Sequence, residues 1–126
     1  MRDSYLGKRI KGSGYAFKGA WILIKTEPSI QVQVGIALLI TAGGFYFDIS
    51  KSDWMFQFFA IGLVLSAEGL NSAVEGIADF VHPDFHTKIG YIKDVAAGAV
   101  LFAAIIAVII AGFIYLPYLF PNLFIK

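Results

Sequence analysis

The sequence predicts an all-α integral membrane protein with three transmembrane helices and an N-terminal amphipathic surface helix. Of its 126 residues, 58% are hydrophobic and only 15% are charged, and the mean hydropathy is +0.73. Residues 29–47 and 95–125 contain no charged side chain at all. Such values are typical of membrane proteins, and the length allows a single domain, residues 1–126.

The charge and cysteine content exclude several classes of function. The net charge is only +1 and no nucleic-acid-reading motif is present, so we expect no nucleic acid partner. The absence of cysteine excludes disulfides, thiolate catalysis and cysteine-ligated zinc. The N-terminal residues lack the apolar core of a signal peptide, so we expect this end of the chain to be retained.

Residues 5–25 are predicted to form the amphipathic helix on the membrane surface. At about 100° per residue, large apolar side chains fall within a sector of about 60°, and lysines lie roughly 100–140° away. The apolar side would enter the membrane interface, and the lysines would face lipid headgroups. Four glycines oppose this prediction, because each costs up to about 1 kcal/mol relative to alanine inside a helix. The apolar residues are Leu6, Ile10, Phe17, Trp21 and Ile24, and the lysines are Lys11, Lys18 and Lys25.

Three predicted spans follow a break at Glu27-Pro28, because a proline suits the first turn of a new helix. The uncharged stretch after this break would be about 28 Å long as a helix, which is enough to cross the hydrocarbon core. Aromatic residues near the span ends are predicted to lie at the headgroup level. The spans are predicted at about 29–47, 54–81 and 95–120, joined by a polar turn at 48–53 and a polar loop at 82–94, with Trp54, Tyr115 and Tyr118 as interfacial residues.

The distribution of basic residues predicts the orientation in the membrane. Residues 1–25 carry six Lys or Arg and the 82–94 loop carries two, whereas the first loop has only Lys51 and the C-terminal end only Lys126. Basic residues accumulate in cytoplasmic segments of membrane proteins. The N-terminus and the 82–94 loop are therefore predicted to be cytoplasmic.

Four polar residues in the second half of the second span share one helix face. They are spaced at 0, 3, 7 and 11, so at about 100° per residue they fall within about 80° of one another. A carboxylate in lipid costs at least about 2.5 kcal/mol, so we expect this face to have a function. A polar seam used only for assembly would suit an asparagine, but three carboxylates repel one another without a cation. The four residues are Glu68, Asn71, Glu75 and Asp79.

This polar face, Glu27 and the Lys93-Asp94 pair are predicted to meet at one depth on the cytoplasmic side. Such a site resembles what phosphoryl transfer needs. Magnesium prefers one or two carboxylates together with phosphate oxygens and water. A lysine can balance charge on the transferring phosphoryl group, and a further carboxylate can accept the proton of an attacking alcohol. We therefore expect phosphorylation of an alcohol that resides in the bilayer.

The alternative is a small oligomeric ion channel or proton-coupled carrier, in which the polar face would line a pore. A pore needs polar residues along the whole crossing. The other half of the second span, residues 56–64, offers only Gln57 and Gly62. A scaffold subunit without chemistry is a further possibility, but it leaves Glu27 and Lys93 at the same depth unexplained.

The polar positions resemble those of the prokaryotic diacylglycerol kinase family, which includes undecaprenol kinases. The resemblance covers nearly the whole chain, and its central motif is specific because fixed polar positions are rare inside a membrane helix. The matching patterns are Glu68-x-x-Asn71-Ser72-x-x-Glu75-x-x-x-Asp79, then Lys93-Asp94 followed by Ala96-Ala97-Gly98-Ala99-Val100, and, before these, Arg9, Gly14-Tyr15-x-Phe17-Lys18-Gly19 and Glu27.

The resemblance implies a homotrimer in the bacterial inner membrane, with active sites shared between subunits and MgATP as phosphate donor. It also implies a role for each matching residue. Glu68 would be the general base toward the lipid hydroxyl, Glu27 and Glu75 would hold Mg²⁺, and Asn71 would orient groups around the phosphates. Lys93 would contact the transferring phosphate, Asp79 and Asp94 would engage the nucleoside of ATP, and Arg9 and Tyr15 would close the site.

Two positions and one stretch bear on the identity of the lipid alcohol. Gln33 and Phe80 stand where some diacylglycerol kinases carry a carboxylate and a basic residue. The 96–100 stretch is nearer the undecaprenol kinase pattern, so undecaprenol is favoured over diacylglycerol. His82 and His86, four residues apart, could bind a metal or serve as loop residues near headgroups.

Overall fold

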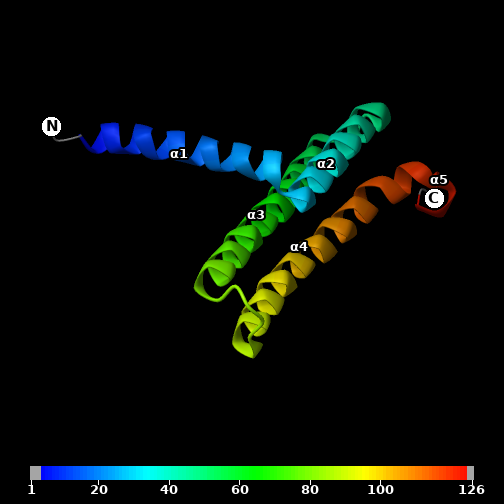
Figure 1. Cartoon of the computed structure of the whole chain (residues 1–126). Helices are drawn as coiled ribbons and strands as arrows, with labels where there is room; N and C mark the ends of the chain where they lie inside the picture. Colours follow the sequence, from blue (N-terminus) through cyan, green and yellow to red (C-terminus); the bar gives the residue numbers. More distant parts are fainter. Residues whose placement is uncertain (1–3, 125–126) are drawn as a thin grey trace.

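The computed structural model describes residues 4–124. Their regular secondary structure is entirely helical. The helices are α1 (Tyr5–Thr26), α2 (Pro28–Phe47), α3 (Lys51–Val81), α4 (Thr87–Leu119) and the short α5 (Pro121–Phe124) (Figure 1). Among these, α2, α3 and α4 are long and apolar enough to cross a membrane. The predicted all-α fold with three spans is therefore confirmed. Arg2 and Lys126, which entered the charge argument, lie outside the described residues.

The N-terminal helix α1 extends away from the other helices (Figure 1). It is continuous from Tyr5 to Thr26 despite its glycines, and none of its residues is buried. Ser4 is the N-cap of the helix, and its side chain accepts a hydrogen bond of 3.0 Å from the Gly7 amide. Phe17 and Trp21 are exposed, as a helix that places apolar side chains in a membrane interface requires.

The junction between α1 and α2 is fixed by hydrogen bonds to the last turn of α1. Gln31 of α2 donates from Nε2 to the carbonyl oxygens of Ile24 and Lys25, at 3.1 Å each. These carbonyls have no partner within their own helix, so the Gln31 side chain caps them. Pro28 occupies the first turn of α2, as predicted.

Three helices form the bundle, and α3 packs against both α2 and α4 (Figure 1). Ala60, Ala78 and Ala103 are buried, and their small side chains allow neighbouring helices to approach closely. Within residues 4–124, no large side chain is fully buried, and many aliphatic and aromatic groups are exposed. In a bilayer such surfaces face lipid or a neighbouring subunit rather than water.

The turn between α2 and α3 is shorter than predicted. Asp48 adopts a left-handed conformation with φ of 50° and ends α2. The Ser50 side chain then accepts a hydrogen bond of 3.1 Å from the Asp53 amide, so α3 begins at Lys51 rather than at residue 54.

The loop between α3 and α4 is also shorter than predicted. The prediction of a polar loop at 82–94 is wrong, because α4 begins at Thr87 and leaves only residues 82–86 between the helices. The His86 ring explains the early start, since its Nδ1 accepts a hydrogen bond of 3.0 Å from the Lys88 amide. Lys93 and Asp94 are therefore held on a helix.

A polar contact ties all three spans together at the end opposite the 82–86 loop. Gln57 of α3 is only 3% exposed and donates from Nε2 to the carbonyl oxygen of Ile40, at 3.3 Å. The Tyr115 hydroxyl of α4 lies within hydrogen-bond distance of Gln57 Oε1 and 2.9 Å from the same carbonyl oxygen. Tyr115 was predicted to be interfacial, but its hydroxyl satisfies Gln57 inside the bundle.

A close contact at Gly44 gives a stability prediction. A Cβ atom at Gly44 would lie 2.6 and 2.8 Å from atoms of the Trp54 ring, and that ring packs against Phe45 and Phe58. Gly44→Ala should therefore lower the free energy of unfolding in detergent by about 1–3 kcal/mol, the usual cost of overpacking. At Gly43 the nearest atom would be 3.7 Å away, so Gly43→Ala is the matched control. Equal stability of the two variants would contradict the contact.

Candidate functional site

The candidate site lies where the end of α3 runs beside the start of α4. Lys93 Nζ of α4 and Asp79 Oδ1 of α3 form an ion pair at 2.6 Å. Their side chains are 38% and 61% exposed, so the pair is open to a ligand from solution. Ala78, beside Asp79, is only 4% exposed and is among the residues buried on α3.

The predicted polar face of α3 forms as one unbroken helical surface, because α3 is continuous from Lys51 to Val81. Asn71 donates from Nδ2 to Glu75 Oε1 at 3.2 Å. Asn71 Oδ1 is buried and has no hydrogen-bond partner among the described residues. Glu68 is half-buried on the same face, whereas Glu75 is exposed. A buried amide oxygen without a donor, beside a carboxylate, provides hard oxygen atoms that fit a cation such as Mg²⁺.

Glu27 occupies the junction between α1 and α2 and is half-buried. Its carboxylate does not cap α2. Leu23, one turn earlier, approaches α3 at Gly69, where an added Cβ would lie 3.1 Å from its side chain. The junction therefore lies next to the polar part of α3. Within residues 4–124, no three histidine or acidic side chains come close enough together to hold a metal.

Arg9 and Tyr15 lie on the half of α1 that points away from the bundle (Figure 1). Arg9 donates from Nε to the Tyr5 hydroxyl at 3.0 Å, and its guanidinium carbon lies 5.2 Å from the centre of the Tyr5 ring. Tyr15 is exposed. In the single chain these two residues do not join the ion pair of α3 and α4, so their part in closing the site stays a prediction.

The two histidines of the 82–86 loop have structural partners. His82 Nδ1 lies 2.7 Å from the Asp84 carbonyl oxygen, so this nitrogen carries the proton and donates it. His86 Nδ1 accepts from the Lys88 amide, so its lone pair is occupied. The rings stack edge to face with centres 5.2 Å apart. These contacts give both histidines a role in the loop, and because they use only the Nδ1 atoms they do not test the metal role.

The His86 cap gives a second stability prediction. His86→Ala should lower the free energy of unfolding by about 1 kcal/mol, because the first turn of α4 loses a side-chain acceptor. His86→Asn should restore most of this loss, since asparagine is a strong N-cap. Both values are measured by denaturant unfolding in detergent micelles. Equal stability of the alanine and asparagine variants would contradict the capping role.

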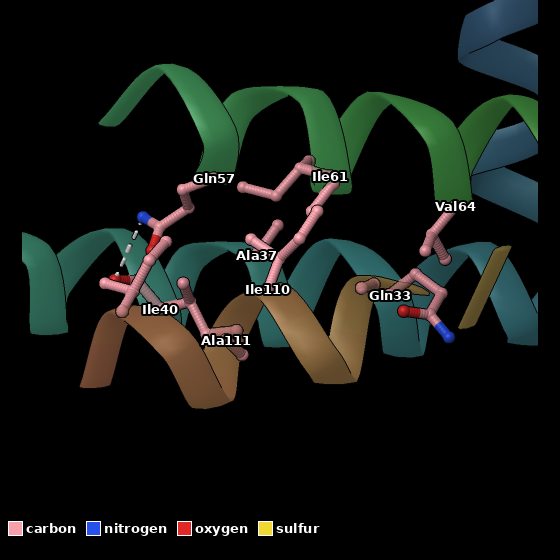
Figure 2. A pocket seen from close by; sticks show the side chains of 11 residues that line it. Gln33, Ala37, Ile40, Gln57, Ile61, Val64, Ile110 and Ala111 are labelled. Carbon is pink, nitrogen blue, oxygen red and sulfur yellow. Dashed lines mark hydrogen bonds between the residues drawn. The ribbon is translucent and has the colours of Figure 1, made fainter. Parts of the chain in front are cut away.

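A cavity of about 60 Å³ lies between α2, α3 and α4, away from the ion pair. Figure 2 shows Gln57 beside Ile40 at one end and Gln33 near Val64 at the other, with aliphatic side chains between them. Gln33 and Gln57 are thus the polar side chains in a space between the spans that aliphatic side chains otherwise line.

Two contacts near the candidate site were not predicted from the sequence: the pairing of Lys93 with Asp79, and the capping of α4 by His86. The pairing could have been predicted from the sequence, because a short loop between antiparallel helices brings Lys93 and Asp79 side by side. The second has little signal, since histidine is not among the preferred N-cap residues.

Comparison with known proteins gives the site its context. Residues 14–115 match the model of the prokaryotic diacylglycerol kinase family. The chain belongs to this family. It is 35% identical to the undecaprenol kinase of Bacillus subtilis (strain 168) over 112 residues, covering 89% of this chain and 91% of that protein. It is also 35% identical to the diacylglycerol kinase of Escherichia coli (strain K12) over 104 residues, covering 79% and 82%.

Membership in the prokaryotic diacylglycerol kinase family makes the protein a membrane lipid kinase that uses ATP. The resemblance found in the sequence is confirmed. The channel or carrier alternative receives no support, because the matched relatives are kinases.

Proposed function

We propose that this kinase transfers the γ-phosphate of MgATP to the hydroxyl of undecaprenol at the cytoplasmic boundary of the bacterial inner membrane. The observation that carries the proposal is the polar face of α3, which ends beside Lys93 of α4. Acidic side chains for a metal and a base thus lie along one face of a continuous helix, and a cation for the phosphate is paired with Asp79 near the end of that face.

The proposed reaction uses the chain's own groups in a fixed order. The Glu68 carboxylate accepts the proton of the lipid hydroxyl, and the hydroxyl oxygen forms a bond to the γ-phosphorus. The bond from that phosphorus to the bridging oxygen breaks, and ADP leaves. Lys93 offsets charge on the transferring phosphoryl group. Each of these groups must hold its position before the lipid arrives, because positioning is most of what phosphoryl transfer requires.

Glu27 and Glu75 are the proposed Mg²⁺ ligands, and Asn71 orients the groups around the phosphates. When bound, Mg²⁺ neutralises charge on the phosphate oxygens. Two carboxylates suffice, because Mg²⁺ usually completes its shell with phosphate oxygens and water. The hydrogen bond from Asn71 to Glu75 fixes the direction of that carboxylate and leaves Asn71 Oδ1 to accept from a water or to bind the cation.

The nucleoside is proposed to lie near Asp94, with Arg9 and Tyr15 closing over it. Because these two residues lie on the outward half of α1, closure requires a neighbouring subunit or a movement of α1. A homotrimer with shared sites supplies the first of these, and we propose that assembly. Chemical cross-linking in native membranes tests it: a ladder ending at three subunits is expected, and a ladder ending at two would contradict it.

Undecaprenol is proposed over diacylglycerol because the undecaprenol kinase matches more of this chain at the same identity, 89% against 79%. The test compares both lipids at equal mole fraction in mixed micelles, with purified protein and saturating MgATP. We expect a larger kcat/KM for undecaprenol. A larger value for diacylglycerol would reverse the lipid assignment while leaving the kinase reaction in place.

A further inference from the structure

The ion pair between Asp79 and Lys93 connects two elements of the proposed site. Asp79 lies near the end of α3, one turn beyond Glu75, and Lys93 lies in the second turn of α4. Their 2.6 Å contact bridges residues fourteen positions apart in the sequence. The chain therefore places the lysine amine against an acidic side chain on the same face as the proposed metal ligand.

Stability does not account for this pair. The side chains are 61% and 38% exposed, and ion pairs exposed to water contribute little to folding. A lysine side chain has four rotatable bonds, and holding it in one conformation costs conformational entropy. If a contact fixes the Lys93 amine before a phosphate arrives, the binding step no longer carries that entropy cost.

The geometry also leaves the amine free to bind a second group. A lysine amine has three N–H donors, and Asp79 Oδ1 takes one of them. The other two remain for phosphate oxygens. The start of α4, which carries the lysine, is itself fixed by the His86 cap. Both ends of the contact therefore belong to ordered helices.

We propose that Asp79 is a positioning residue that acts on the reaction through Lys93, rather than through a contact with the nucleoside. This inference rests on the proposed function. Asp79 holds the Lys93 amine on the α3 side of the site, where it meets the γ-phosphate. Neutralised by the lysine, the Asp79 carboxylate does not repel the triphosphate.

The test is a double-mutant cycle with two nucleotides. Asp79→Asn, Lys93→Met and the double variant are assayed with MgATP and with MgGTP, which share a triphosphate and differ in the base. Asp79→Asn is expected to lower kcat about tenfold with both nucleotides, because misplacing one group is enough for such a loss. In the Lys93→Met background the same change is expected to have less than about a twofold effect.

Amine labelling provides a readout that does not depend on turnover. A lysine-acylating reagent followed by mass spectrometry is expected to label Lys93 faster in Asp79→Asn than in wild type, while labelling of Lys88 stays unchanged. Asp84→Asn is the matched control, because it removes an exposed carboxylate from the adjacent loop. It should leave both the labelling of Lys93 and the kcat as in wild type.

Three outcomes separate the hypotheses. Independent effects of Asp79→Asn and Lys93→Met, with a changed ratio of ATP to GTP use, would overturn the positioning role in favour of a nucleoside contact. Unchanged labelling of Lys93 in Asp79→Asn would overturn the ion pair itself. A wild-type protein that phosphorylates no lipid, yet shows the labelling difference, would overturn the proposed function and leave the pairing intact.

Discussion

Glu75→Gln is expected to abolish phosphate transfer, with a loss of about 10³-fold or more in kcat that saturating lipid does not restore. The reason is electrostatic, because a neutral amide holds Mg²⁺ far less well than a carboxylate, and the metal stabilises charge in phosphoryl transfer. Glutamine keeps the Oε1 atom that accepts from Asn71 Nδ2, so the local hydrogen bond and the helix should persist. The loss would then report chemistry rather than folding.

The measurement is lipid phosphate formed per minute by purified variants over a range of Mg²⁺ concentrations. The matched control is Asp53→Asn, which removes a carboxylate from the opposite end of the same helix. This control should retain wild-type turnover. Full activity of Glu75→Gln would remove Glu75 from the site.

Glu68→Gln is expected to separate nucleotide binding from chemistry. A general base contributes typically about 10²–10⁴-fold, so turnover should fall by that factor. Binding of MgATP, measured by equilibrium dialysis, should stay close to wild type, because Glu68 contacts the lipid hydroxyl rather than the nucleotide. Wild-type turnover in this variant would refute its role as the base, and parallel loss of MgATP binding would reassign it to the nucleotide.

The spans were predictable from the sequence because long uncharged stretches leave few alternatives to helices in lipid. The starts of α3 and α4 were not. Charged residues such as Lys88, Lys93 and Asp94 suggested a loop, yet a helix can continue beyond the apolar core when its first turn is capped. The uncharged stretches indicate where the chain enters the lipid, whereas the capping side chain determines where the helix begins.

The polar face was predictable because helical spacing alone places Glu68, Asn71, Glu75 and Asp79 together. The partner chosen by each side chain was not predictable. Lys93 was expected at the phosphate, and the structure adds its contact with Asp79, which depends on how α3 and α4 pack. The buried Gln57 and its contact with Tyr115 likewise depend on an approach of three helices that no local pattern encodes.

The position of α1 relative to the site could not be predicted from the sequence either. Amphipathic spacing predicted a helix but not its direction, and α1 points away from the bundle in the single chain (Figure 1). Arg9 and Tyr15 reach a nucleotide only if another subunit or a movement of α1 brings them there. Their assignment therefore depends on the assembly.

The most direct measurement is the transfer of labelled γ-phosphate from MgATP to a lipid alcohol by the purified protein in mixed micelles. We expect labelled lipid phosphate in the organic extract, formed only when Mg²⁺ and either undecaprenol or diacylglycerol are present, and absent with Glu75→Gln. An extract without label for both lipids, from folded protein with Mg²⁺ present, would contradict the account.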